Sequence, residues 1–154
     1  MSLDAIRTAI VATMNTVTNV GIVHDYERYA KLEAEFKALY VAQIAGKGQV
    51  RGWYVRRLAT REVSQVIGRY QVTHEWLVRG FMAIEDAAGS EKVFDTLIES
   101  VRDVFRTDET LGGVVSSTVT RDAAGLQLEE SVPVLFAGVL CHSARLKLIT
   151  THDQ

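Results

Sequence analysis

The amino-acid sequence predicts an α+β fold, in which two main α-helices pack on one face of an antiparallel β-sheet with long strands and a β-hairpin. Three observations predict it. Two segments repeat apolar residues at three- and four-residue steps, other segments alternate apolar and polar residues, and glycine-containing turns separate the alternating segments. A helix with one apolar stripe and a sheet with one apolar face bury these surfaces against each other. We expect one domain over residues 1–154.

The first helix is predicted from residue 3 to about residue 17. Its apolar residues are Leu3, Ile6, Ile10, Met14 and Val17. Ser2 precedes them as a candidate N-cap, whose side chain would accept a hydrogen bond from a free N–H of the first turn. Asn19 and Gly21 end the helix, and residues 20–23 follow as a short strand.

Residues 27–48 fit two patterns, because Tyr29, Leu32, Phe36 and Tyr40 have helical spacing whereas residues 36–44 also alternate as a strand would. We interpret the segment as a short helix near 27–35 followed by a strand near 36–44. A turn at Gly46-Lys47-Gly48 then leads into a strand over residues 50–58, rich in aromatic and β-branched residues.

The longest alternating segment is residues 66–83, and it predicts a half-buried antiparallel strand. The face expected to be buried carries mainly apolar side chains and one histidine: Tyr70, Val72, His74, Trp76, Val78 and Met82. The opposite face is mostly polar, with Arg69, Gln71, Thr73, Glu75 and Arg79.

A second helix follows Ser90, a candidate cap, and Leu111-Gly112-Gly113 closes it; its apolar stripe runs from Val93 to Phe105. Residues 114–121 and 126–132 are predicted to form a hairpin around the turn at 122–125. The last long strand is expected over 134–149, bent at Gly138. Two strands are long for so small a sheet, and projecting strands favour self-association.

Composition excludes several classes of protein. Apolar residues make up 47% and charged residues 23%, which is ordinary for a globular domain and excludes global disorder. A net charge of −2 lacks the strongly positive field of most nucleic-acid-binding proteins. No apolar run approaches the length that a membrane span needs, and the first residues lack the pattern of a signal peptide. We therefore expect no membrane association and no sequence-specific binding of nucleic acid.

No catalytic, cofactor-binding or metal-binding set is predicted. His74-Glu75 begins like a zinc-protease motif, but Val78 stands where the second histidine would be, and the segment is a strand. Cys141 and His142 are neighbours in a strand and therefore point to opposite faces. Gly46-Lys47-Gly48 lacks the earlier glycine and the Ser or Thr of a phosphate-binding loop. We expect a protein that is not an enzyme and needs no cofactor.

The most suggestive local feature is an arginine cluster interleaved with aromatic residues: Arg51, Trp53, Tyr54, Arg56, Arg57 and Arg61. Such a pattern fits three interpretations: a surface that stacks bases, an ordinary solvated strand face, or an arginine-rich protein interface. The third interpretation also suits Arg69 and Arg79. The net charge of −2 favours an interface or plain surface over nucleic acid.

Several short segments, in this order along residues 3 to about 150, resemble the tail terminator (tail completion, minor tail protein U-like) proteins of tailed bacteriophages and prophages. After the N-terminal helix they are residues 23–29 (VHDYERY), 51–53 (RGW), 74–82 (HEWLVRGFM), 85–91 (EDAAGSE), the apolar positions Phe94, Leu97 and Ile98, then 105–106 (FR) and 111–113 (LGG). The likeness is one of order and pattern, and it includes no catalytic signature.

The resemblance implies an α+β protein of the virion tail, assembled in the cytoplasm of the host bacterium as a hexameric ring. Such a protein binds the end of the tail tube, stops its polymerisation and meets the head–tail connector protein. Its partners would be copies of itself, the tail tube protein and the connector. The contact candidates are Arg56, Arg57, Arg69 and Arg79. Two alternatives stay open: another head–tail adaptor or neck protein, and a small-ligand-binding α+β dimer or an enzyme on that scaffold.

Overall fold

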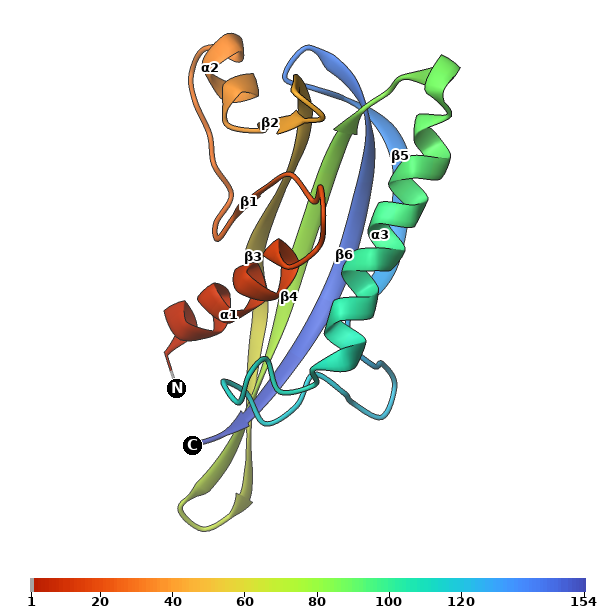
Figure 1. The fold of residues 1–154 in the computed structure, drawn as a ribbon. Helices are drawn as coiled ribbons and strands as arrows, with labels where there is room; N and C mark the ends of the chain where they lie inside the picture. The colour runs from red at the N-terminus through yellow and green to blue at the C-terminus, as the bar shows by residue number, and fades with distance from the viewer. Residues whose placement is uncertain (1) are drawn as a thin grey trace.

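The computed structural model, which describes residues 2–154, is an α+β fold built on a mostly antiparallel sheet, as the sequence predicts (Figure 1). The strands lie in the order β1-β3-β4-β6-β5, and β2 pairs with the start of β3. Their bounds are β1 Ile22–His24, β2 Val41–Ile44, β3 Lys47–Val66, β4 Arg69–Ala83, β5 Gln127–Phe136 and β6 Val139–Asp153. The helices are α1 Leu3–Asn15, α2 Glu33–Ala38 and α3 Ser90–Thr107, with a 3₁₀ turn η1 at Asp86–Ala88.

One face of the sheet is covered by α1 and α3, which fixes the main core between them (Figure 1). Ser2 caps α1 as predicted, because its Oγ accepts a hydrogen bond from the N–H of Ala5 at 3.1 Å. The largest side chains of this core are fully buried and come from α1, from the strands β3 and β4 and from α3: Ile6, Ile10, Met14, Trp53, Trp76, Phe94 and Phe105. Both indoles donate hydrogen bonds inside the core, Trp53 to the Val20 carbonyl at 2.8 Å and Trp76 to Thr150 at 3.0 Å.

The opposite face is covered only at one end, by the segment that contains α2 and β2. Tyr40 lies in this second cluster with Phe81 and Phe136, whose rings are stacked 3.9 Å apart. The prediction of a helix near 27–35 and a strand near 36–44 is wrong in its bounds. Phe36 and Tyr40 contact one another and Phe136, so their spacing of four residues is that of α2 and its last turn, and only Val41–Ile44 is extended.

The predicted strand over 66–83 is two strands joined by a tight turn. The chain reverses at Ile67-Gly68, where Gly68 has a φ of +80°, and β3 extends to Val66 rather than ending near residue 58. The alternation within β4 is confirmed from Val72 onward, because His74, Trp76, Val78 and Met82 are buried against the helices.

The C-terminal third also differs from the prediction. Residues 114–121 form no strand, and the expected hairpin around 122–125 is reduced to an isolated bridge between Val119 and Ala124. The true hairpin lies at Ala137-Gly138, where both residues have positive φ, so the predicted bend at Gly138 is a chain reversal between β5 and β6. Apolar alternation continues on both sides of that turn, which hides it in the sequence.

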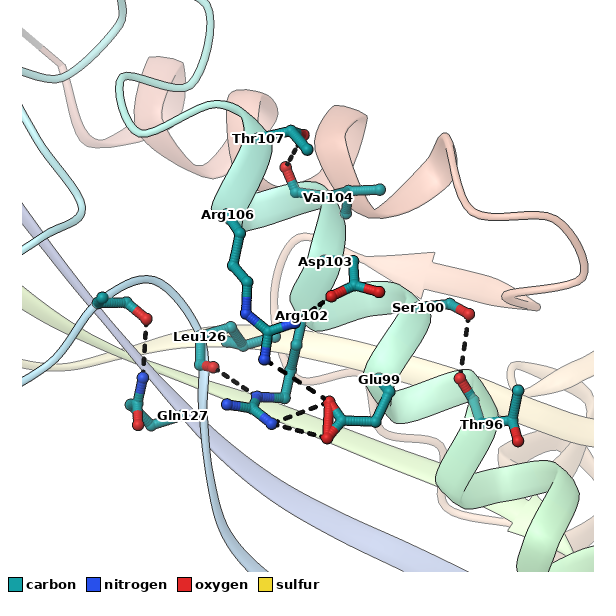
Figure 2. Close-up of polar contacts among 11 residues, drawn as sticks. Thr96, Glu99, Ser100, Arg102, Asp103, Val104, Arg106, Thr107, Leu126 and Gln127 are labelled. Carbon is teal, nitrogen blue, oxygen red and sulfur yellow. Dashed lines mark hydrogen bonds and ion pairs between the residues drawn. The ribbon is translucent and has the colours of Figure 1, made fainter.

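The second helix is correctly predicted, but Ser90 does not cap it. Gly89 occupies the N-cap, while Ser90 Oγ accepts a hydrogen bond from the N–H of Glu85 at 2.8 Å. Near its other end, α3 holds the loop of residues 108–126 (Figure 2). Arg102 donates from Nε to the Leu126 carbonyl at 3.0 Å and from Nη1 to both carboxylate oxygens of Glu99. Arg106 pairs with Asp103 and lies 3.9 Å from Glu99.

Candidate interaction surface

The far half of the β3–β4 hairpin, residues 56–70, ends in a turn that projects beyond the rest of the molecule, and we call it the arm (Figure 1). Every residue of the arm is exposed, whereas residues 50–55 of the same strand are all buried. Neither α1 nor α3 reaches the turn at the end of the arm, and the segment of α2 and β2 covers only the other end of the sheet (Figure 1). Up to Val63 the arm is therefore the exposed outer strand of the sheet, because its partner β4 is itself paired with β6, and only between Ser64 and Arg69 is it a two-stranded ribbon.

The outer edge of β3 is unpaired along the arm. β2 pairs with residues 47–50 and β1 with residues 52–54, and within residues 2–154 no strand pairs with the outer edge beyond Tyr54. An open edge presents alternate N–H and C=O groups that a neighbouring chain can complete. The edge strand on the opposite side, β5, contains Pro133 and a bulge between Leu128 and Glu130, both of which disfavour strand addition.

The arm exposes large apolar side chains. Ile67, at the turn, is fully exposed, and Val66 beside it is 60% exposed. Three others are between 41% and 53% exposed: Leu58, Val63 and Tyr70. Single exposed apolar residues are common on protein surfaces, but several on one projecting ribbon indicate a contact surface.

The arm is also positively charged. It contains four arginines, Arg56, Arg57, Arg61 and Arg69, against a single acid, Glu62, which gives a formal charge of +3. Because the whole chain carries −2, the remainder carries −5. Arg56 forms an ion pair with Glu27 at 3.3 Å, but within the described part of the chain Arg61 and Arg69 form none.

The four arginines predicted as contacts do not form one patch. Arg56, Arg69 and Arg79 project from the face away from the helices, whereas Arg57 lies opposite Trp76 and therefore on the helix-covered face. Arg79 is only partly exposed, and its guanidinium lies 5.3 Å above the Phe81 ring. The arm thus contains three of the four, and Arg79 belongs to the second apolar cluster.

A histidine pair lies where the arm joins the core. The rings of His74 and His152 are 5.4 Å apart, and Thr60 Oγ1 is hydrogen-bonded to His74 Nδ1 at 2.8 Å. Both imidazoles are buried, and this burial lowers the pKa of each. Within residues 2–154 no group of three or more His, Cys, Asp or Glu side chains is placed to hold a metal ion. Burial thus favours the neutral form of both rings, which lie on the neighbouring strands β4 and β6.

A recess of about 400 Å³ lies at the other end of the molecule, between the start of α3 and β5. We call it the acidic recess, and its lining includes Phe94, Pro133, His142 and the carboxylates of Asp86, Glu91 and Asp95. Ser90 Oγ is 2.8 Å from His142 Nε2 in its wall. Ser90 is buried and already accepts the Glu85 N–H, and no acid bonds to His142 in the described chain, so this pair lacks the third group of a hydrolytic triad.

The remaining nucleophile candidate is shielded. Cys141 is fully buried in the second apolar cluster, and this burial raises the pKa of its thiol to about 11. It therefore stays protonated at neutral pH, so it is a poor nucleophile. The sequence prediction missed the exposed turn at Ile67-Gly68; its only local signal was an apolar residue beside a glycine.

No protein-family model matches the chain, and no curated protein sequence matches it. No helix within residues 2–154 is both long and apolar enough to cross a membrane. The functional interpretation therefore depends on the sequence resemblance and on the surfaces described above.

Proposed function

We propose that this chain is a structural protein of a bacteriophage or prophage tail, which caps the tail tube, ends its polymerisation and contributes to joining the tail to the head. It would act as a hexameric ring in the virion tail, assembled in the bacterial cytoplasm. Its partners would be its own copies, the tail tube protein and the head–tail connector protein. It would catalyse no reaction.

The single observation that carries the proposal is the bare arm. β3 exposes every side chain from Arg56 to Val66 and leaves its outer edge unpaired, and the turn that joins it to β4 extends past the core (Figure 1). In a protein that works alone such an edge is an aggregation hazard, whereas in an assembly it is a contact. The order of sequence segments, which resembles that of tail terminator proteins, suggests that this assembly is a phage tail.

The chemistry of the interior supports the same proposal. Among residues 2–154, the acidic recess brings together no nucleophile–base–orienter set, and burial favours the neutral form of the Cys141 thiol and of His74 and His152.

The test is a tube-capping assay. Purified protein is added to polymerising tail tube protein of the same phage or prophage, and tube lengths are measured by electron microscopy. We expect shorter tubes with added density at one end, in proportion to the amount of protein. Tubes of unchanged length without end density would refute the proposal, and binding to the connector alone would assign the chain to the neck instead.

A further inference from the structure

We propose that the tip of the arm of one copy docks in the acidic recess of the next copy, so that the contact between copies is head-to-tail. This inference rests on the proposed function for the existence of an assembly and adds the two surfaces that form it. Ile67 would insert among the apolar residues of the recess, while Arg61 and Arg69 would meet its carboxylates.

The positions of the two surfaces decide the geometry of the contact. The arm extends past one end of the molecule, where the C-terminus also lies, and the recess is at the opposite end, beside the start of α3 (Figure 1). One copy therefore cannot bring its own arm to its own recess. Contacts between unlike surfaces at opposite ends are heterologous, and they generate rings or filaments.

The tip of the arm has the chemistry of an inserted anchor. Ile67 is fully exposed at the turn, and Val66 and Arg69 flank the turn on β3 and β4. An exposed branched aliphatic side chain gains free energy when it enters an apolar pocket. Arg69 beside the turn, and Arg61 further back on β3, would then be placed at the rim, where bidentate pairing with carboxylates is available.

The recess has the complementary chemistry. Phe94, Val132 and Pro133 contribute apolar surface, and Asp86, Glu91 and Asp95 contribute negative charge. Within residues 2–154 none of these three carboxylates forms an ion pair. Residues 84–95 carry four acids and one lysine, a formal charge of −3 that matches the +3 of the arm.

Charge also argues against two other occupants. An arm-to-arm contact would bring two surfaces of +3 together, which is unfavourable. A nucleic acid bound by the arm would face a remainder of the chain that carries −5, and the phosphate backbone would be repelled. A second copy is the partner that offers both the apolar pocket and the opposite charge.

The experiment mixes two variants that each lack one surface. Ile67→Asp removes the anchor, and the double variant Glu91→Lys with Asp95→Lys reverses the charge of the recess. All three substituted residues are exposed, so the fold is expected to persist, which circular dichroism and urea unfolding check. Leu32→Asp, at an exposed position on the segment of α2, is the matched control. Molar mass is measured by light scattering over a range of concentrations.

We expect the wild type and the control to self-associate, and each arm or recess variant to associate about 100-fold more weakly. An equimolar mixture of the two variants should form a discrete dimer, because one intact arm then meets one intact recess and neither chain can extend further. The charge pairing should also weaken as salt is raised, because exposed charges are screened.

Three results would overturn the inference: a wild type that stays monomeric at all concentrations, a recess variant that assembles like the wild type, or a mixture of folded variants that stays monomeric. If the protein instead stays monomeric and binds duplex DNA through Arg61 and Arg69, the partner of the arm is a nucleic acid and not a second copy. The tube-capping assay separates the two claims, since capping by a protein with a different self-contact refutes only the docking. If the two variants form a heterodimer but the wild type does not cap tail tubes, only the proposed tail function is refuted.

Discussion

β3 passes from a buried base, residues 50–55, to the exposed arm without losing its pairing with β4. The base lies between the helices on one face and the segment of α2 and β2 on the other, whereas every side chain of the arm is exposed. Backbone hydrogen bonds are therefore common to both halves, and burial of side chains is what differs. The comparison separates the part of the strand that stabilises the fold from the part available to partners.

The largest expected effect is at the base. Trp53 is fully buried, donates to the Val20 carbonyl at 2.8 Å and stacks near Phe94. Gly80 opposite it has no room for a side chain, because a Cβ there would collide with the indole. Trp53→Ala should lower the free energy of unfolding by about 3–5 kcal/mol, measured by urea denaturation. A loss below about 1 kcal/mol would show that the base does not hold the core.

A matched pair on the same strand sharpens the comparison. Val55 is fully buried and Val63 is 53% exposed. Val55→Ala should cost about 2 kcal/mol through lost burial and a residual cavity, and Val63→Ala should cost less than about 0.5 kcal/mol. Thermal and urea unfolding of dilute protein measure both. Equal costs would mean that the arm is packed in the monomer.

Arginines offer a second matched pair, one in the helix and one in the arm. The guanidinium of Arg102 on α3 donates hydrogen bonds to the Leu126 carbonyl and to Glu99 (Figure 2). The side chain of Arg69 forms no hydrogen bond or ion pair within residues 2–154. Arg102→Ala should lower the free energy of unfolding by about 1 kcal/mol, because solvent weakens the contacts of this partly exposed side chain. Arg69→Ala should leave the free energy of unfolding nearly unchanged. The reverse order would contradict the assignment of Arg69 to a contact between copies.

The smallest expected effect is on pH dependence at the junction between base and arm. Burial lowers the pKa of His74 and His152 below the usual 6.5, with the other histidine and Arg57 adding to the shift of His74. The unfolded chain therefore binds more protons than the folded one just below pH 6.5, so the free energy of unfolding falls as pH decreases through that range.

His74→Gln with His152→Gln should flatten this decline between about pH 7 and pH 5, measured by urea unfolding at each pH. His24→Gln is the control, because that ring is not part of the pair and donates a hydrogen bond from Nε2 to the Leu39 carbonyl at 2.6 Å instead. A decline that persists unchanged in the double variant would assign the pH dependence to other groups.

The sequence predicted the elements whose periodicity is enforced by burial. The stripe of α1, the stripe of α3 and the alternation of β4 from Val72 each face the main core, so polar substitutions there are costly and the pattern is clean. The turns were predicted poorly. At Ile67-Gly68 and Ala137-Gly138 an apolar residue precedes the glycine, and alternation continues through the reversal, so no polar cluster indicates it.

The candidate surface was predicted only in part. Arginine density indicated residues 56–69, but a sequence pattern cannot tell an arginine engaged within its own chain from one that is not. Arg79, above Phe81, and Arg57, on the helix-covered face, show that the assignment depends on register. The acidic recess could not be predicted from the sequence, because the fold brings together residues 84–95, 131–133 and 142 to line it. Its opposite charge to the arm is therefore visible only in the structure.

Hydrogen–deuterium exchange along the arm, measured by mass spectrometry at several protein concentrations, tests most directly whether residues 56–70 exist to contact another chain. Because the outer edge of β3 is unpaired beyond Tyr54 within residues 2–154, the amides of the arm that point to this edge should exchange quickly in dilute protein and become protected as copies associate, while those of residues 50–55 stay protected throughout. Exchange in the arm that stays equally fast at every concentration, in protein that nevertheless forms oligomers, would contradict the account.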